Sequence, residues 1–161
     1  MDKLELLKEY VVNGKVLQLA TITEGGPWVC HVWYVADWDN DRLLFTSRTT
    51  RNHSVHIEYD HRVAGGILDM ELTSLGQSVR GVSFTGSARV VPLSDLLGSI
   101  YKFSKRWPAA DLAHAAIANG STNIRLYEIN INKWVLHDEV NMPSDPRFEY
   151  EPNACDGISD V

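Results

Sequence analysis

Residues 43–59 read LLFTSRTTRNHSVHIEY, an apolar segment followed by a polar run and then a helical segment. Leu43-Leu44-Phe45 is typical of a buried strand, and Asn52–Tyr59 is predicted to be a short helix. Between them, each of the six side chains of Thr46–Arg51 can donate a hydrogen bond. Unpaired backbone N–H groups and the positive end of the helix dipole would add to these donors. The stretch therefore predicts a phosphate site; the alternative is that its two arginines simply solvate a loop.

The composition indicates one soluble globular domain. The chain has 161 residues, of which 44% are hydrophobic and 22% are charged, with a net charge of −6. Because this charge repels phosphate backbones on average, we expect no nucleic-acid partner. The local positive charge of Arg48 and Arg51 stands out against it.

Three further features predict a cytoplasmic protein that does not associate with membranes. The segment Met1–Glu5 is charged, unlike the start of a secretory signal. No apolar run approaches the ~20 residues that a membrane helix needs. Two cysteines, Cys30 in an apolar strand pattern and Cys155 in a polar tail, are too few for a disulfide framework.

The remaining pattern predicts strands with a few helices. The predicted helices are Leu4–Asn13, Asn52–Tyr59, Ser94–Phe103 with Ser94 as N-cap, and Asp111–Ala118. The predicted strands are Val16–Thr23, Trp28–Asp37, Arg42–Thr46, Arg62–Leu68, Val79–Val91, and a last strand or strand pair over Ile124–Ile131 and Lys133–Val140. Short loops between the first three strands predict antiparallel neighbours. Gly81 and Gly86 inside a long strand suit the bends of a small barrel.

We therefore predict one mainly β (α+β) domain over residues 1–142. The segment 143–161 lacks periodicity and is predicted to be a flexible acidic tail.

The sequence offers no catalytic constellation. It has no Gly-x-Ser-x-Gly elbow, and Cys30 sits where a core residue would sit. His53, His56 and His61 lie close together, but a histidine pair at i, i+3 without a ligand at a standard zinc spacing matches metal sites poorly. We predict no metal site, and the catalytic residues stay unknown.

Aromatic residues crowd the strand before the donor run. They are Trp28, Trp33, Tyr34 and Trp38. One interpretation is a flat ligand that lies along this strand and places its phosphate on the Thr46–Arg51 segment. The alternatives are barrel core and a protein–protein surface, where aromatic residues are also common.

The order of these motifs resembles the pyridoxamine 5'-phosphate oxidase-like FMN-binding split barrels over roughly residues 5–140. The resemblance rests on Val16–Thr23, Gly25-Gly26-Pro27, Val32–Ala36, Leu43-Leu44-Phe45-Thr46, Thr50-Arg51, Arg62-Val63-Ala64, the later strand Gly81-Val82-Ser83-Phe84-Thr85-Gly86-Ser87-Ala88, and Arg106-Trp107-Pro108. It implies a six-stranded antiparallel split barrel with Greek-key topology and a few peripheral helices. It also implies a homodimer that holds FMN between its subunits and acts as a flavin-dependent oxidoreductase on an unknown small molecule.

The resemblance also implies particular cofactor contacts. Backbone contacts with the flavin ring fall to Val32, Trp33, Tyr34 and Val35. Thr46 and Ser47 would lie near the ribityl chain or the phosphate, Thr50 and Arg51 would grip the phosphate, and Arg48 would be an additional contact.

Departures from the family pattern argue against oxidation of pyridoxine phosphate. The oxidase proper has basic residues at the positions of Cys30 and Val35, and an arginine–histidine closing segment that the tail from Met142 lacks. The sequence therefore resembles an uncharacterised branch of the family. The alternatives are a non-catalytic flavin- or haem-binding sensor, for which His53, His56 or His61 would be examined, and a dimeric interaction domain without a cofactor.

Overall fold

The computed structural model describes residues 2–152 of the chain. The helices are α1 (Lys3–Asn13), α2 (Asn52–Tyr59), α3 (Leu93–Arg106) and α4 (Asp111–Ala118), with short 3-10 turns η1 (Trp38–Asn40) and η2 (Pro108–Ala110). The strands are β1 (Val16–Thr23), β2 (Gly26–Asp37), β3 (Arg42–Arg48), β4 (Arg62–Ile67), β5 (Arg80–Val90), β6 (Ile124–Asp138) and β7 (Arg147–Tyr150).

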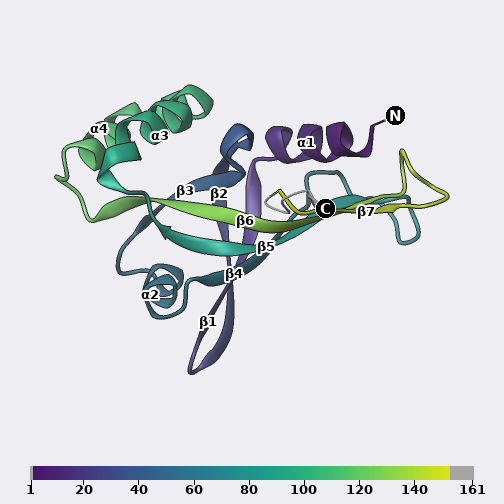
Figure 1. Cartoon of the computed structure of the whole chain (residues 1–161), viewed down its shortest axis with the longest axis horizontal. Helices are drawn as coiled ribbons and strands as arrows, with labels where there is room; N and C mark the ends of the chain where they lie inside the picture. The colour runs from purple at the N-terminus through teal and green to yellow at the C-terminus, as the bar shows by residue number, and fades with distance from the viewer. Residues whose placement is uncertain (1, 153–161) are drawn as a thin grey trace, which may run out of the picture.

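Six of the strands form the predicted antiparallel barrel. The sheet order is β3-β2-β1-β4-β5-β6-β7, and an additional β3–β6 pairing closes strands β1 to β6 on themselves. The fourth strand returns beside the first, which is the Greek-key arrangement. Helices α1, α3 and α4 lie on one side of the barrel, and α2 lies on the other (Figure 1).

Two apolar clusters hold these layers together. The larger fills the barrel and includes Leu7, Tyr34, Phe45 and Trp134. The smaller lies outside it, where residues of β2, β3 and β6 are covered by α3 and α4. Its members are Val35, Leu44, Val91, Phe103, Ile117 and Leu126.

A buried ion network joins α3 to the barrel. The Arg42 guanidinium donates to Asp37 at 2.8 Å and to Glu128 and the α3 residue Asp95 at 2.5 Å each. Lys102 of α3 also donates to Asp37, at 2.5 Å. Burial raises the pKa of Asp37, but the hydrogen bonds from Lys102, Asn40 and Arg42 outweigh it and lower the pKa overall.

The C-terminal prediction is wrong for part of the tail. Residues Arg147–Tyr150 form β7, which pairs with Trp134–His137 of β6. Residues 143–146 and 151–152 are in no helix or strand, and the remaining residues of the predicted tail, 153–161 with Cys155, lie outside the described residues.

The start of α3 differs from the prediction, and the structure decides the form of the last strand. Helix α3 begins at Leu93 with Pro92 at the cap position, so Ser94 lies inside the first turn and is not the N-cap. Proline before a helix fixes its own φ near the helical value and needs no N–H partner. Of the predicted last strand or strand pair, the structure has one continuous strand, β6, with a register shift opposite Thr85 and Gly86 of β5.

Candidate functional site

The barrel is open between β2 and β3, and this opening defines the candidate site. Strand β3 pairs with β2 only through Arg42–Phe45, opposite Tyr34–Asp37. The whole of β3 pairs with β6 on its other edge, so its last residues, Thr46–Arg48, pair with β6 alone. The segment Trp28–Trp33 of β2 pairs with β1 on its other edge. Among the described residues, no strand pairs with the β3-facing edge of this segment, so its backbone groups are available to a ligand.

The donor run lies at the end of β3, where the two strands separate. The Arg51 N–H donates to the Arg48 carbonyl at 3.1 Å, and the Thr49 N–H donates to the Asn123 carbonyl at 3.0 Å. These bonds fix the backbone of the run without using the guanidinium groups. Thr46 is half-buried and Ser47 is buried, whereas Arg48, Thr50 and Arg51 are exposed.

The first turn of α2 is suited to an anion. Arg51 occupies the N-cap position and its side chain makes no cap hydrogen bond. The first turn contains no acidic residue. Within residues 2–152, neither Arg48 nor Arg51 has an acidic partner. Free N–H groups, the helix dipole and two unpaired guanidinium groups together match the chemistry of a phosphate.

A polar cluster beneath the donor run supports it. The Ser47 Oγ lies 2.7 Å from the His53 Nε2, and the Ser54 Oγ donates to the Ser47 Oγ at 3.1 Å. Burial, with the nearby charges of Arg51 and His56, lowers the pKa of His53. The Oη of the fully buried Tyr127 has no hydrogen-bond partner. This cluster fixes α2 against β3.

The side chains of the four predicted flavin-ring contacts, Val32–Val35, lie in different environments. Val32 and Tyr34 point into the barrel core, where the Tyr34 hydroxyl donates to the Val11 carbonyl at 2.6 Å. Val35 belongs to the cluster under α3 and α4. Trp33 is 58% exposed. Tyr34 and Val35 pair with Phe45 and Leu44 of β3. Of the four residues, only Val32 and Trp33 therefore lie on the open edge, where a ligand would meet the backbone and the side chain of Trp33.

Trp107 is a residue near this strand that the sequence did not assign to the site. Its indole N–H donates to the Tyr34 carbonyl at 3.1 Å, and its ring meets the Trp33 ring edge-on at 4.9 Å. The sequence signal was Arg106-Trp107-Pro108, which contributed to the family resemblance without a role in the site. The structure adds that Trp107 folds back onto β2.

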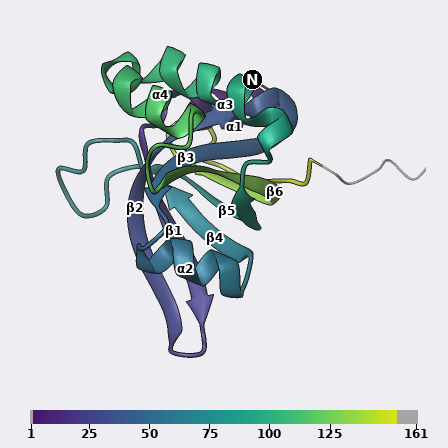
Figure 2. The ribbon, with the colours of Figure 1, turned by 90° about the vertical axis from the view of Figure 1, so that its left-hand side faces the viewer.

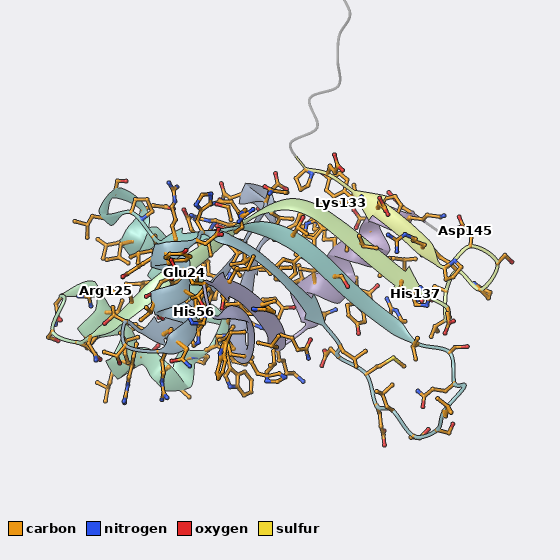
Figure 3. All side chains as sticks on the ribbon, turned by 90° about the horizontal axis from the view of Figure 1, so that it is seen from below. Glu24, His56, Arg125, Lys133, His137 and Asp145 are labelled. Carbon is orange, nitrogen blue, oxygen red and sulfur yellow. The ribbon has the colours of Figure 1, made fainter. Side chains whose placement is uncertain are left out.

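The aromatic group predicted from the sequence is divided in space. Trp28 meets His56 edge-on at 6.4 Å beside α2. Trp38 stacks on Trp134 and Tyr150, at 6.1 and 6.5 Å. Figure 3 labels His56 and Arg125 toward one end of the molecule and His137 and Asp145 toward the other. Strand β7, which carries Tyr150, pairs with β6 as far as His137. Trp38 therefore stacks on a strand that lies at the end of the molecule away from α2.

The cysteine and histidines offer little catalytic chemistry. Burial raises the pKa of the Cys30 thiol to about 11, so it is protonated at neutral pH. His56 lies 3.0 Å from the Thr21 hydroxyl, His53 contacts Ser47, and His61 is exposed. Within residues 2–152, no group of three or more His, Cys, Asp or Glu side chains is placed to hold a metal ion.

The comparisons with known proteins agree with this architecture. The sequence model described as pyridoxamine 5'-phosphate oxidase matches residues 5–138. The chain belongs to the pyridoxamine 5'-phosphate oxidase family. The part of this family member that the structure describes has no helix both long and apolar enough to cross a membrane. Comparison with curated proteins gives no match.

Solved structures similar to this pyridoxamine 5'-phosphate oxidase family member share its fold. A haem-binding protein from Mycobacterium smegmatis is 14% identical with a TM-score of 0.76, and the match covers 94% of this chain and 58% of that one. An FAD-binding protein from Mesorhizobium loti is 16% identical with a TM-score of 0.62, covering 83% and 92%. The haem storage protein HutZ from Vibrio cholerae is 20% identical with a TM-score of 0.61, covering 81% and 91%.

Proposed function

We propose that this protein binds FMN and acts as a flavin-dependent oxidoreductase on a small molecule. The observation that carries the proposal is the segment between β3 and α2, where Arg48 at the end of β3 and Arg51 at the N-cap of α2 lie without acidic partners beside the open edge of β2. Membership of a family with flavin-binding members supports the same cofactor. The edge of Trp28–Trp33 that does not pair with β1 offers backbone groups that a flavin ring can hydrogen-bond.

Each predicted residue has a proposed role in holding the cofactor. Thr50 and Arg51 would bind the phosphate, with Arg48 as an additional contact and Thr46 and Ser47 near the ribityl chain. The backbone of Val32 and Trp33, the two predicted ring contacts that lie on the open edge, would orient the ring. FMN, when bound, supplies hydride-transfer chemistry. The chain itself would orient the ring and exclude water from one of its edges.

We also propose that the protein forms a homodimer through the hairpin and α2. The β1–β2 hairpin projects beyond the barrel with α2 beside it (Figure 2). Large apolar side chains are exposed along both elements: Ile22, Trp28, Val29, Val55 and Tyr59. Burying this surface between two copies would stabilise the dimer and close the opening beside β2.

The dimer is tested by light scattering. Val29→Lys is expected to give a monomer, because it places a charge in the apolar surface. Leu112→Lys changes an exposed leucine on α4 and is the matched control, expected to stay dimeric. A monomeric wild-type protein would contradict the dimer.

Haem is the second candidate, and the haem-binding protein of Mycobacterium smegmatis and HutZ favour it. The same donors would suit haem propionates, and the exposed His61 after α2 would be available as an axial ligand. Titration with haem would then give a Soret band, and His61→Ala would lose that band.

The FMN proposal is tested by comparing FMN with riboflavin, which lacks the phosphate. Flavin fluorescence should be quenched on binding, and FMN should bind about 10–100-fold more tightly, the value of one or two charge-assisted hydrogen bonds. Equal affinity would contradict the phosphate assignment, and no flavin binding at all would contradict the proposed cofactor. Oxidation of NADH or NADPH by the FMN-loaded protein would support an enzyme over a carrier.

A further inference from the structure

We infer that a second site, between α1, the end of β2 and the last turns of α3, binds a small organic anion. A cavity of about 560 Å³ opens there. Four cationic side chains line it: Lys8 of α1 and Lys102, Lys105 and Arg106 of α3. Val12, Val35, Ala36 and Trp38 supply its apolar wall. The volume lies within the range of small-molecule sites in proteins.

The positive charge of the cavity is not neutralised by its own walls. Two carboxylates line it, Asp37 and Asp39. Asp37 is buried and is already paired with Arg42 at 2.8 Å and with Lys102 at 2.5 Å. Within residues 2–152, Lys8 and Lys105 have no acidic partner. Three cationic groups therefore face one remaining carboxylate, on a chain whose net charge is −6.

The rim of the cavity is held in place from both sides. The Arg106 guanidinium donates to the Asn13 carbonyl at 3.0 Å and to the Gly14 carbonyl at 3.4 Å. These bonds join the end of α3 to the end of α1 while leaving the charge of Arg106 uncompensated. Since the two helices are far apart in sequence, the fold itself brings their cations to one cavity.

The apolar wall specifies the rest of the ligand. Trp38 is fixed by stacking on Trp134 and Tyr150, at 6.1 and 6.5 Å. An inorganic ion would leave this wall in contact with water, whereas a ligand with an apolar body would cover it. The chemistry that fits both walls is a carboxylate or phosphate monoester attached to a small apolar body.

The position of the cavity also gives it a role in turnover. Val35 lines the cavity and lies two residues along β2 from Trp33, whose backbone is proposed to orient the flavin ring. The cavity would then hold the substrate, so the substrate class is a small organic anion. This role rests on the proposed function, whereas anion binding by the cavity does not.

Calorimetry on the full-length protein tests the site with phenyl phosphate, benzoate, inorganic phosphate and the neutral benzyl alcohol. At least one aromatic anion should bind at least about 10-fold more tightly than benzyl alcohol and than inorganic phosphate, as charge-assisted hydrogen bonds and apolar contact combine. The double variant Lys8→Gln/Lys105→Gln should weaken that binding about 10-fold or more. The matched control Lys15→Gln removes one charge from an exposed lysine outside the cavity and should bind as wild type.

Three results would overturn the inference: equal binding of anions and benzyl alcohol, unchanged binding by the double variant, or equal loss in Lys15→Gln. FMN titration of the same proteins separates the two proposals. FMN binding without anion binding would leave the cofactor assignment standing and remove the cavity. Anion binding without FMN binding would remove the flavin chemistry and leave the cavity as a binding site.

Discussion

The His53 Nε2 lies 2.7 Å from the Ser47 Oγ, so the first turn of α2 is tied to the end of β3. Ser54 adds a second bond to the same serine oxygen, at 3.1 Å. Both contacts lie beneath the segment that carries Arg48, Thr50 and Arg51. The contacts of Ser47 with His53 and Ser54 therefore fix the backbone that carries the exposed donors. Such preorganisation lowers the entropic cost of binding a phosphate.

Arg51→Ala should weaken FMN binding by about 1.5–3 kcal/mol, the usual scale for a hydrogen bond to a charged group. The guanidinium has no acidic partner among the described residues, so its loss should act on the ligand rather than on stability. Flavin fluorescence titration measures the affinity, and thermal unfolding checks the fold. Arg147→Ala, an exposed arginine on β7, is the matched control and should bind FMN as wild type. Unchanged affinity in Arg51→Ala would show that the phosphate lies elsewhere.

The pH dependence of stability should report on His53. Burial, with Arg51 and His56 nearby, lowers its pKa in the folded protein below the usual 6.5. The unfolded chain then binds more protons than the folded chain below that pH, so stability is lost as the pH falls through this window. The melting temperature of wild type should drop more between about pH 7 and pH 5 than that of His53→Gln. His137→Gln, at an exposed position, should keep the wild-type slope, and equal slopes in all three proteins would refute the assignment.

Much of the barrel could be predicted from local sequence, because strand and helix limits there coincide with turn chemistry. Strand β1 ends at Thr23 before Glu24-Gly25, and α2 spans Asn52–Tyr59 as predicted. The family resemblance supplied the Greek-key closure, which depends on the non-local pairing of β3 with β6.

What the sequence did not predict depends on contacts between distant segments. Strand β7 has only four residues, so the alternation of Phe148 and Tyr150 with polar residues is too short to predict a strand from sequence. Trp38 and Trp134 supply the surface against which Tyr150 packs. The place of Trp107 depends on the Tyr34 carbonyl, which is far away in sequence. Proximity in sequence also grouped Trp38 with Trp28, whereas Trp28 lies near the start of the twelve-residue β2 and Trp38 follows its end.

Gly65→Ala should destabilise the fold by about 1–3 kcal/mol, the cost of overpacking a well-packed core. A Cβ at this position would collide with the Gln18 carbonyl of β1 and with the Phe84 ring of β5. Urea unfolding measures the loss. The matched control is Gly25→Ala in the β1–β2 turn, where the nearest contact of a Cβ is the Thr23 hydroxyl at 3.5 Å. A Gly65→Ala protein as stable as Gly25→Ala would mean that β1, β4 and β5 separate more easily than their packing indicates.

Arg42→Met should destabilise the protein by about 3 kcal/mol, because removing one partner of a buried ion pair leaves a buried charge uncompensated. Arg42 serves Asp37 and Glu128, which are 4% and 1% exposed. Lys102 would still bond Asp37 at 2.5 Å, and Arg89 would still bond Glu128 at 2.6 Å. Because each carboxylate keeps one partner, the expected loss lies at the lower end of the roughly 3–5 kcal/mol that breaking a buried ion pair costs.

The midpoint of urea unfolding measures the effect of Arg42→Met. Arg147→Met removes an arginine whose pair with Glu149 is exposed, and its midpoint should stay at the wild-type value. Adding Glu128→Gln to Arg42→Met removes one of the two carboxylate charges that Arg42 had paired. This should recover part of the loss, because an amide costs less to bury than a carboxylate that has lost a partner. If the double variant were less stable than Arg42→Met, the remaining Arg89–Glu128 pair would be the stronger contact, and the network would not be organised around Arg42.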